Sequence, residues 1–192
     1  EKTLLKQERR RADSALDVAE KVLGQMYFYQ GKFGLTLKGK TRNGRKVFKY
    51  GFIDQNGKEV IPFKFDEASA FSLEDGFARV QMGGQKFLLD TDGNRYLLAE
   101  SMAELTERTK ALDIDPNLRE VNFENIDTYP KLQIILARNS SPTRTRTSNK
   151  GLEYLPPAIT RLPRLRILDL FNNRIKSLPE DFHKLAFLER LV

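Results

Sequence analysis

Residues 165–179 read LRILDLFNNRIKSLP, and the spacing of their apolar side chains decides the expected fold of the C-terminal half. Leucine or isoleucine stands at the first, fourth, sixth and eleventh positions, asparagine at the ninth, and Leu-Pro at the end. The pattern restarts at Leu188, and earlier copies begin at Thr109 and Leu132, so that the same interval separates 109 from 132 and 165 from 188. A fixed period of this length indicates stacked copies of one supersecondary unit.

The interval from Leu132 to Leu165 is longer than the others, and the polar stretch 141–150 accounts for the excess. The pattern resembles the short, intracellular type of leucine-rich repeat, in which the leucines face a core and each copy adds one strand to a parallel ladder. We therefore expect a leucine-rich repeat solenoid over 109–192 with an insertion at 141–150. Because solenoids end in polar caps and this sequence ends at Val192 in an expected strand, we expect a piece of a longer protein.

Residues 1–26 carry apolar side chains at three- and four-residue spacing, which predicts an amphipathic helix. Such a helix suits a stem or the end of a coiled coil, through which two copies could associate. Packing against its own domain explains the same stripe equally well.

Residues 27–98 alternate between apolar and polar side chains and predict a β-meander. Asn43-Gly44, Asn56-Gly57 and Asp92-Gly93 are strong hairpin-turn signals. Asp54 and Gly57 reappear with the same spacing as Asp90 and Gly93, which indicates an internal repeat.

The central unit of this meander, residues 50–62, reads YGFIDQNGKEVIP and resembles the bacterial WG (or KWG) repeat. The resemblance extends over roughly residues 30–97. It departs at Tyr50, which replaces the tryptophan, and at Lys86-Phe87, where a second Trp-Gly would stand. The resemblance implies short antiparallel hairpins and no known catalytic residue.

With a short linking helix over 99–108, these segments give an expected α+β fold: helix 1–26, meander 27–98, linker 99–108 and solenoid 109–192. The composition argues against catalysis and cofactors, because cysteine is absent, His183 is the single histidine and no phosphate-binding or nucleophile motif occurs. No apolar run approaches the roughly 18 residues of a membrane span. We therefore expect a non-enzymatic chain without metal or cofactor, away from membranes, in the reducing cytoplasm.

In a repeat of this kind, the residues between the leucines face the concave side. This places the intervening residues in three rows, which are Lys110, Gln133, Arg166 and Glu189 in the first, Asp113, Leu136 and Asp169 in the second, and Asp115, Arg138 and Phe171 in the third. Apolar and charged side chains mix on this surface, as they do at interface hot spots. Any solenoid also displays such residues without using them. The candidate partner-binding residues are Lys110, Asp113, Gln133, Leu136, Arg138, Arg166, Asp169 and Phe171.

Basic side chains concentrate in the first fifty residues, which carry 13 Lys or Arg against 5 Asp or Glu. A dense basic stretch with aromatic neighbours is a candidate anion or nucleic-acid contact, although charges on a hairpin also serve solubility alone. The candidate anion contacts are Lys38, Lys40, Arg42, Arg45, Lys46 and, in the 141–150 insertion, Arg144 and Arg146.

The sequence thus predicts a protein-interaction module within a larger bacterial multidomain protein of signalling or defence type, with its partner on the concave face. The alternative is nucleic-acid or anion binding through the basic N-terminal half. The two differ in salt dependence, which is steep for binding to phosphates.

Overall fold

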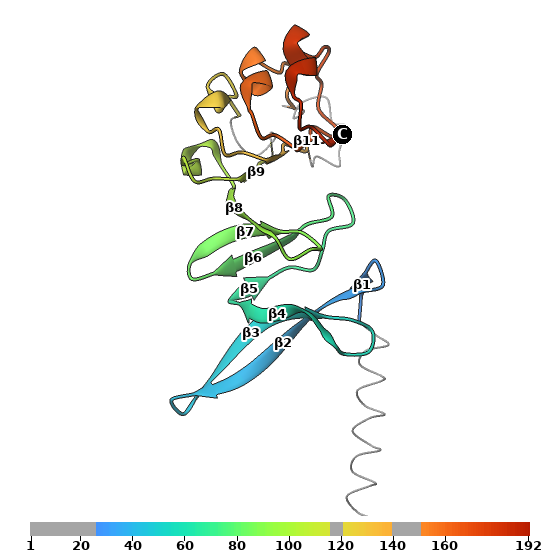
Figure 1. Cartoon of the computed structure of the whole chain (residues 1–192), viewed down its shortest axis with the longest axis vertical. Coiled ribbons are helices and arrows are strands. Elements are labelled where there is room, and N and C mark those ends of the chain that lie inside the picture. The colour runs from blue at the N-terminus through green and yellow to red at the C-terminus, as the bar shows by residue number, and fades with distance from the viewer. Residues whose placement is uncertain (1–25, 116–120, 140–150) are drawn as a thin grey trace, which may run out of the picture. The chain divides into compact units, whose positions relative to one another are not determined.

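The computed structural model describes residues 26–115, 121–139 and 151–192 (Figure 1). They divide into two compact units. The first contains the described residues up to Gly84 together with Leu89–Asn94, and the second contains Gln85–Leu88 and the described residues from Arg95 onward.

The first unit is built on a four-stranded antiparallel sheet. It is formed in the order β1 (Phe28–Tyr29), β2 (Phe33–Arg42), β3 (Arg45–Ile53) and β4 (Glu59–Phe65). Two further strands, β5 (Glu67–Ala68) and β6 (Ala78–Met82), pair antiparallel. Strand β7 (Gln85–Leu89) follows in the chain.

Phe71 is the centre of an aromatic cluster in the first unit. Its buried ring lies 5.4 Å from the ring of Tyr29, 5.2 Å from Phe33 and 4.9 Å from Phe52, measured between centroids. Rings at these separations and tilts contribute dispersion and quadrupole attraction in addition to their buried area. Because Phe71 lies in a connection between strands, the cluster ties that connection to β1, β2 and β3.

Two turns of the first unit have the same hydrogen bonds. The backbone N–H of Asp54 donates to Lys58 and that of Gly57 donates back to Asp54, and the same bonds join Asp90, Asn94 and Gly93. Each aspartate Oδ1 also accepts two backbone N–H groups at 2.8–3.0 Å. Both glycines have positive φ, of 75° and 83°, which explains their type.

The second unit repeats a short strand followed by a 3₁₀ turn. Five strands, β8 to β12, pair parallel in chain order. They are β8 (Arg95–Ala99), β9 (Ala111–Asp113), β10 (Ile134–Leu136), β11 (Ile167–Asp169) and β12 (Arg190–Leu191). The connections between them hold η1 (Met102–Glu104), η2 (Ile126–Thr128), η3 (Pro157–Arg161) and η4 (Glu180–Lys184).

The strand register follows the spacing of the leucine segments. Ala111 pairs with Ile134 and Ile167 pairs with Arg190, each across one ordinary repeat, whereas Ile134 pairs with Ile167 across the longer interval that contains 141–150. Leu-Pro pairs set the start of two 3₁₀ turns, because Pro156 and Pro179 occupy the N-cap positions of η3 and η4.

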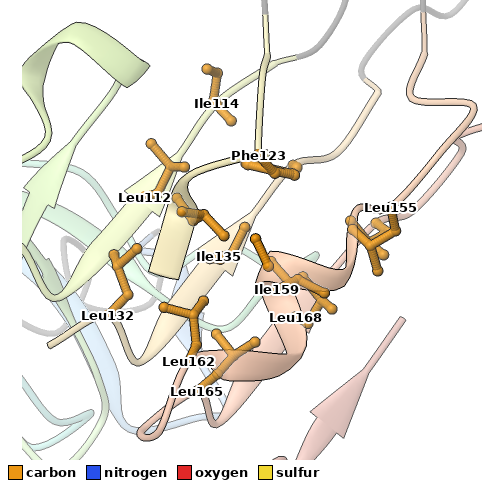
Figure 2. Packing of buried hydrophobic residues seen from close by; sticks show 14 of the residues in the cluster. Leu112, Ile114, Phe123, Leu132, Ile135, Leu155, Ile159, Leu162, Leu165 and Leu168 are labelled. Carbon is orange, nitrogen blue, oxygen red and sulfur yellow. The ribbon is translucent and has the colours of Figure 1, made fainter. Parts of the chain in front are cut away.

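One hydrophobic core fills the space between these strands and the 3₁₀ turns. Figure 2 shows Leu112, Ile135 and Leu168 of the strands pointing toward Ile159 and Leu162 of the η3 segment. All five are at most 2% exposed. Neighbouring strands therefore bury their leucines against one shared core, which no single copy could form alone.

The expected α+β class is wrong, because the structure is mainly β. Among the residues that the structure describes, the helical segments are 3₁₀ turns of three to five residues. Within the expected linking helix over 99–108, only Met102–Glu104 forms such a turn. The expected helix over 1–26 lies outside the described residues except for Met26, which precedes β1.

Candidate functional site

The row of candidate residues that precedes the strands forms a continuous backbone ladder. The N–H of Gln133 donates to the carbonyl of Lys110, Arg166 donates to Gln133, and Glu189 donates to Arg166, each at 2.8 Å. Because successive hydrogen bonds fix these four residues, their side chains stand at neighbouring positions along one edge of the ladder. Sequence spacing alone had placed them in this order.

Within this row, Arg166 and Glu189 form a bidentate ion pair. The Nε and Nη2 atoms of Arg166 lie 2.8 and 2.9 Å from the two carboxylate oxygens of Glu189. This hydrogen bond lowers the pKa of Glu189 and raises the pKa of Arg166, to which the hydroxyl of Tyr96 adds a smaller contribution. Both side chains remain partly exposed, at 43% and 57%. The pair is thus oriented and accessible.

We expect the carboxyl group of Glu189 to titrate below its ordinary pKa in the folded chain, and an Arg166→Gln variant to return it to the ordinary value. A depressed folded-state pKa means that the pair stabilises the fold above the unfolded-state pKa and that this contribution is lost as the pH falls through the folded-state pKa. Carboxyl chemical shifts followed by NMR across the acid range measure this. An identical titration in both proteins would show that the pair does not persist in solution.

The middle row of candidates is largely buried. Leu136 is 0% exposed and Asp169 is 1% exposed, while Asp113 is half-buried. Asp169 Oδ1 accepts the backbone N–H of Phe171 at 3.1 Å and lies 3.5 Å from Nε of Arg138. Asp169 therefore orients its neighbours, and in this structure neither it nor Leu136 presents a surface to a partner.

The row that follows the strands places a cation over an aromatic ring. The guanidinium carbon of Arg138 lies 5.1 Å from the ring centroid of Phe171. The backbone joins the two segments as well, since the N–H of Asn139 donates to the carbonyl of Phe171 at 3.0 Å. Phe171 is nevertheless 54% exposed. A large aromatic side chain that is fixed in place yet open to solvent is typical of an interface hot spot.

Next to the first row lies a cavity of about 390 Å³, lined by Gln133, Pro163, Arg164, Arg166 and Phe187. Two of its residues were candidates, whereas Pro163, Arg164 and Phe187 were missed because they lie outside the strand segments. The signal was available in the sequence: Arg164 and Phe187 each stand directly before the first leucine of a copy, at the same position of the repeat.

The candidate anion contacts fall into two groups. Lys38 on β2 and Arg45 and Lys46 on β3 are exposed. Lys40 and Arg42 are also residues of β2. Arg144 and Arg146 lie outside the described residues. Within the described ranges, no group of three or more His, Cys, Asp or Glu side chains is placed to hold a metal ion. In the same part of the chain, no helix combines the length and apolarity that crossing a membrane would take.

The comparisons with known proteins bear on the first unit and its border. Residues 50–85 of the 192 match the family model described as WG containing repeat. The match begins at Tyr50 and includes β4, β5 and β6, and it confirms the WG-repeat resemblance over that range. The second turn at Asp90–Asn94 repeats the hydrogen bonds of the first just beyond it. No curated protein and no solved structure matched the chain.

Proposed function

We propose that residues 109–192 are a leucine-rich repeat solenoid and that the chain uses one strand-side surface of it to bind a protein partner. The residues of this surface are Lys110, Gln133 and Arg166 before the strands and Arg138 and Phe171 after them. Lys110 and Phe171 are exposed, and the other three are partly buried. Parallel strands bonded in register support the proposal, since a rigid scaffold loses little conformational entropy when it binds.

The exposed ring of Phe171 is the observation that carries this proposal. Arg138 holds the ring from one side, so the aromatic surface is pre-positioned before any partner arrives. Aromatic and arginine side chains are the types most enriched among residues that dominate binding energy. The cavity beside Arg166 and Phe187 offers a second point at which a partner side chain can be inserted.

We further propose that the chain is a non-enzymatic scaffold module of a larger bacterial multidomain protein of signalling or defence type. The pairing of WG-like hairpins with leucine-rich copies supports this by analogy of domain order. The cysteine-free sequence is consistent with a reducing cytoplasm. On this proposal the WG-like unit links the interaction surface to the remainder of that protein.

A double substitution, Phe171→Ala with Arg166→Ala, is expected to weaken partner binding by at least about a hundredfold, since two central hot-spot residues each contribute on the order of 2 kcal/mol. The partner is first identified by placing a photoreactive phenylalanine analogue at position 171 and isolating the cross-linked protein from cells. Its affinity for the wild-type and variant chains is then measured by titration calorimetry.

The matched control is Tyr154→Ala with Arg174→Ala. This pair also removes one exposed aromatic ring and one exposed arginine from the second unit, away from the strand rows. The control is expected to bind within about twofold of wild type, because scattered surface residues contribute little. If the Phe171–Arg166 variant bound the cross-linked partner as tightly as the control does, the proposed surface would be wrong.

A further inference from the structure

The β2–β3 hairpin continues well beyond the sheet to which it belongs. Its two strands pair from Gly34 with Ile53 as far as Arg42 with Arg45. Strand β4, in contrast, pairs with β3 only at Tyr50, Phe52 and Ile53. Residues 38–49, called here the distal ribbon, therefore have no partner strand besides each other among the described strands (Figure 1).

The distal ribbon builds no core. Its residues from Thr41 to Phe48 whose exposure is described are all exposed, and Val47 and Phe48 are 40% and 53% exposed. Phe48 lies against the backbone of Gly39, where a Cβ atom would come within 2.8 Å of the ring. This contact stiffens the pair of strands without burying the ring. Folding of the first unit therefore does not account for the length of the ribbon.

All charged residues of the distal ribbon are basic. It contains six Lys or Arg residues and no Asp or Glu. Lys49 is held in an ion pair by Asp66 at the base, and Nζ of Lys38 lies 5.4 Å from the ring centroid of Phe63. Lys38 pairs opposite Lys49 on one face, whereas Lys46, opposite Thr41, belongs to the other face. Arg45 lies on the same face as Lys49, because the two are separated by an even number of positions along β3, so among the described side chains Lys46 is the one basic residue on the other face.

We propose that the distal ribbon is a binding site for duplex DNA, which it engages through the phosphates without reading the base sequence. A two-stranded ribbon fits the major groove of B-form DNA, which is about 12 Å wide. A groove is bordered by phosphates of both strands, and the ribbon presents Lys38 and Arg45 on one face and Lys46 on the other. The major groove of A-form RNA is too narrow for such an element. This site is separate from the proposed protein-binding surface.

The probe is a fluorescein-labelled DNA duplex of about 20 base pairs, titrated with the full chain by fluorescence anisotropy at roughly 50 to 200 mM KCl. With four or five phosphates neutralised, the logarithm of the association constant should fall with the logarithm of salt at a slope of about −4. A triple variant, Lys38→Gln, Arg45→Gln and Lys46→Gln, should bind at least about tenfold more weakly and reduce the slope by about 2.7.

The matched control replaces Lys58, Lys131 and Lys176 by glutamine. It removes the same three charges at exposed positions outside the ribbon. This control should retain the wild-type slope within about one unit, because its residues are not expected to contact phosphates. Far-ultraviolet circular dichroism checks that both triple variants keep their strand content.

Three results would overturn the proposal: no binding of the wild-type chain at the lowest salt, equal losses in the two triple variants, or equal affinity for an RNA duplex. Vesicles containing phosphatidylserine are tested in parallel, because exposed Val47 and Phe48 beside basic residues also suit an anionic membrane. Binding to vesicles but not to DNA would replace the proposed ligand. The Phe171–Arg166 double variant should bind DNA normally, so this test is independent of the proposed protein-binding surface.

Discussion

Replacing Leu168 by alanine is expected to lower the free energy of unfolding of the second unit by about 2–5 kcal/mol. Leu168 is 0% exposed and stands in register with Ile135 on the neighbouring strand (Figure 2). Removing its side chain loses the transfer free energy of the buried methyl groups and leaves a cavity in a core that several copies share. Denaturant unfolding should show a lower midpoint with an unchanged slope.

Leu178→Ala is the control for this experiment. It is the same chemical change in the same unit, at a side chain that is 45% exposed. We expect a loss below about 1 kcal/mol, because little apolar area returns to water there. Equal losses at the two positions would mean that the core between the strands and the 3₁₀ turns is not packed as described.

The parallel register could be anticipated from the sequence because the spacing of buried side chains is set by the strand itself. A constant repeat length pairs Leu112 with Ile135 whatever conformation the connection between them adopts. The extra residues before Leu165 do not change this register, because Ile134 still pairs with Ile167. The hairpin turns could also be predicted from the sequence. Asp54 and Asp90 accept the same backbone N–H groups in turns that require glycine at a positive φ.

The 3₁₀ turns between the strands could not be predicted from the sequence in the same way. In the connections of the second unit, Pro156 and Pro157 stand at the start of η3 and the turn ends by Leu162. Only a few residues separate the Leu-Pro pair from the next leucine segment, so one 3₁₀ turn fills the distance. The α+β class was wrong for a different reason: it rested on helices over 1–26 and 99–108, of which the first lies outside the described residues except for Met26 and the second contains only the turn Met102–Glu104.

The sequence predicted which residues lie on the candidate surface but not which of them are exposed. Alternation along a strand assigns Leu136 and Asp169 to the face opposite the core, but it contains no information on whether that face is covered. Both are buried in the structure, and the exposed candidates Lys110 and Phe171 lie at the two ends of the strands. The ion pair of Arg166 with Glu189 follows from the repeat spacing, whereas the placement of Arg138 over Phe171 depends on side-chain rotamers that spacing does not determine.

Replacing Asn173 by aspartate is expected to cost about 2–4 kcal/mol of unfolding free energy, since each buried group left without its partner costs about 1–3 kcal/mol. The side-chain amide of Asn173 donates to the carbonyls of Ala137 and Leu170, at 2.6 and 2.7 Å. Its Oδ1 accepts the N–H of Leu152 at 2.8 Å. A carboxylate keeps this last bond, but it loses both donated bonds and turns a negative charge toward two carbonyl oxygens.

Asn122→Asp provides the matched control, because Oδ1 of the exposed Asn122 accepts one backbone N–H, from Glu124, and aspartate retains that bond. Its effect should stay within about 0.5 kcal/mol, as for most surface substitutions. A Cβ atom at Gly151 would stand 3.2 Å from Oδ1 of Asn173, so the backbone of segment 151–152 passes close to the acceptor that aspartate keeps. If Asn173→Asp unfolded at the same denaturant concentration as Asn122→Asp, the asparagine would not join segments 137–139 and 151–152, and the junction of β10 with the next copy would have to be stabilised by the leucine core alone.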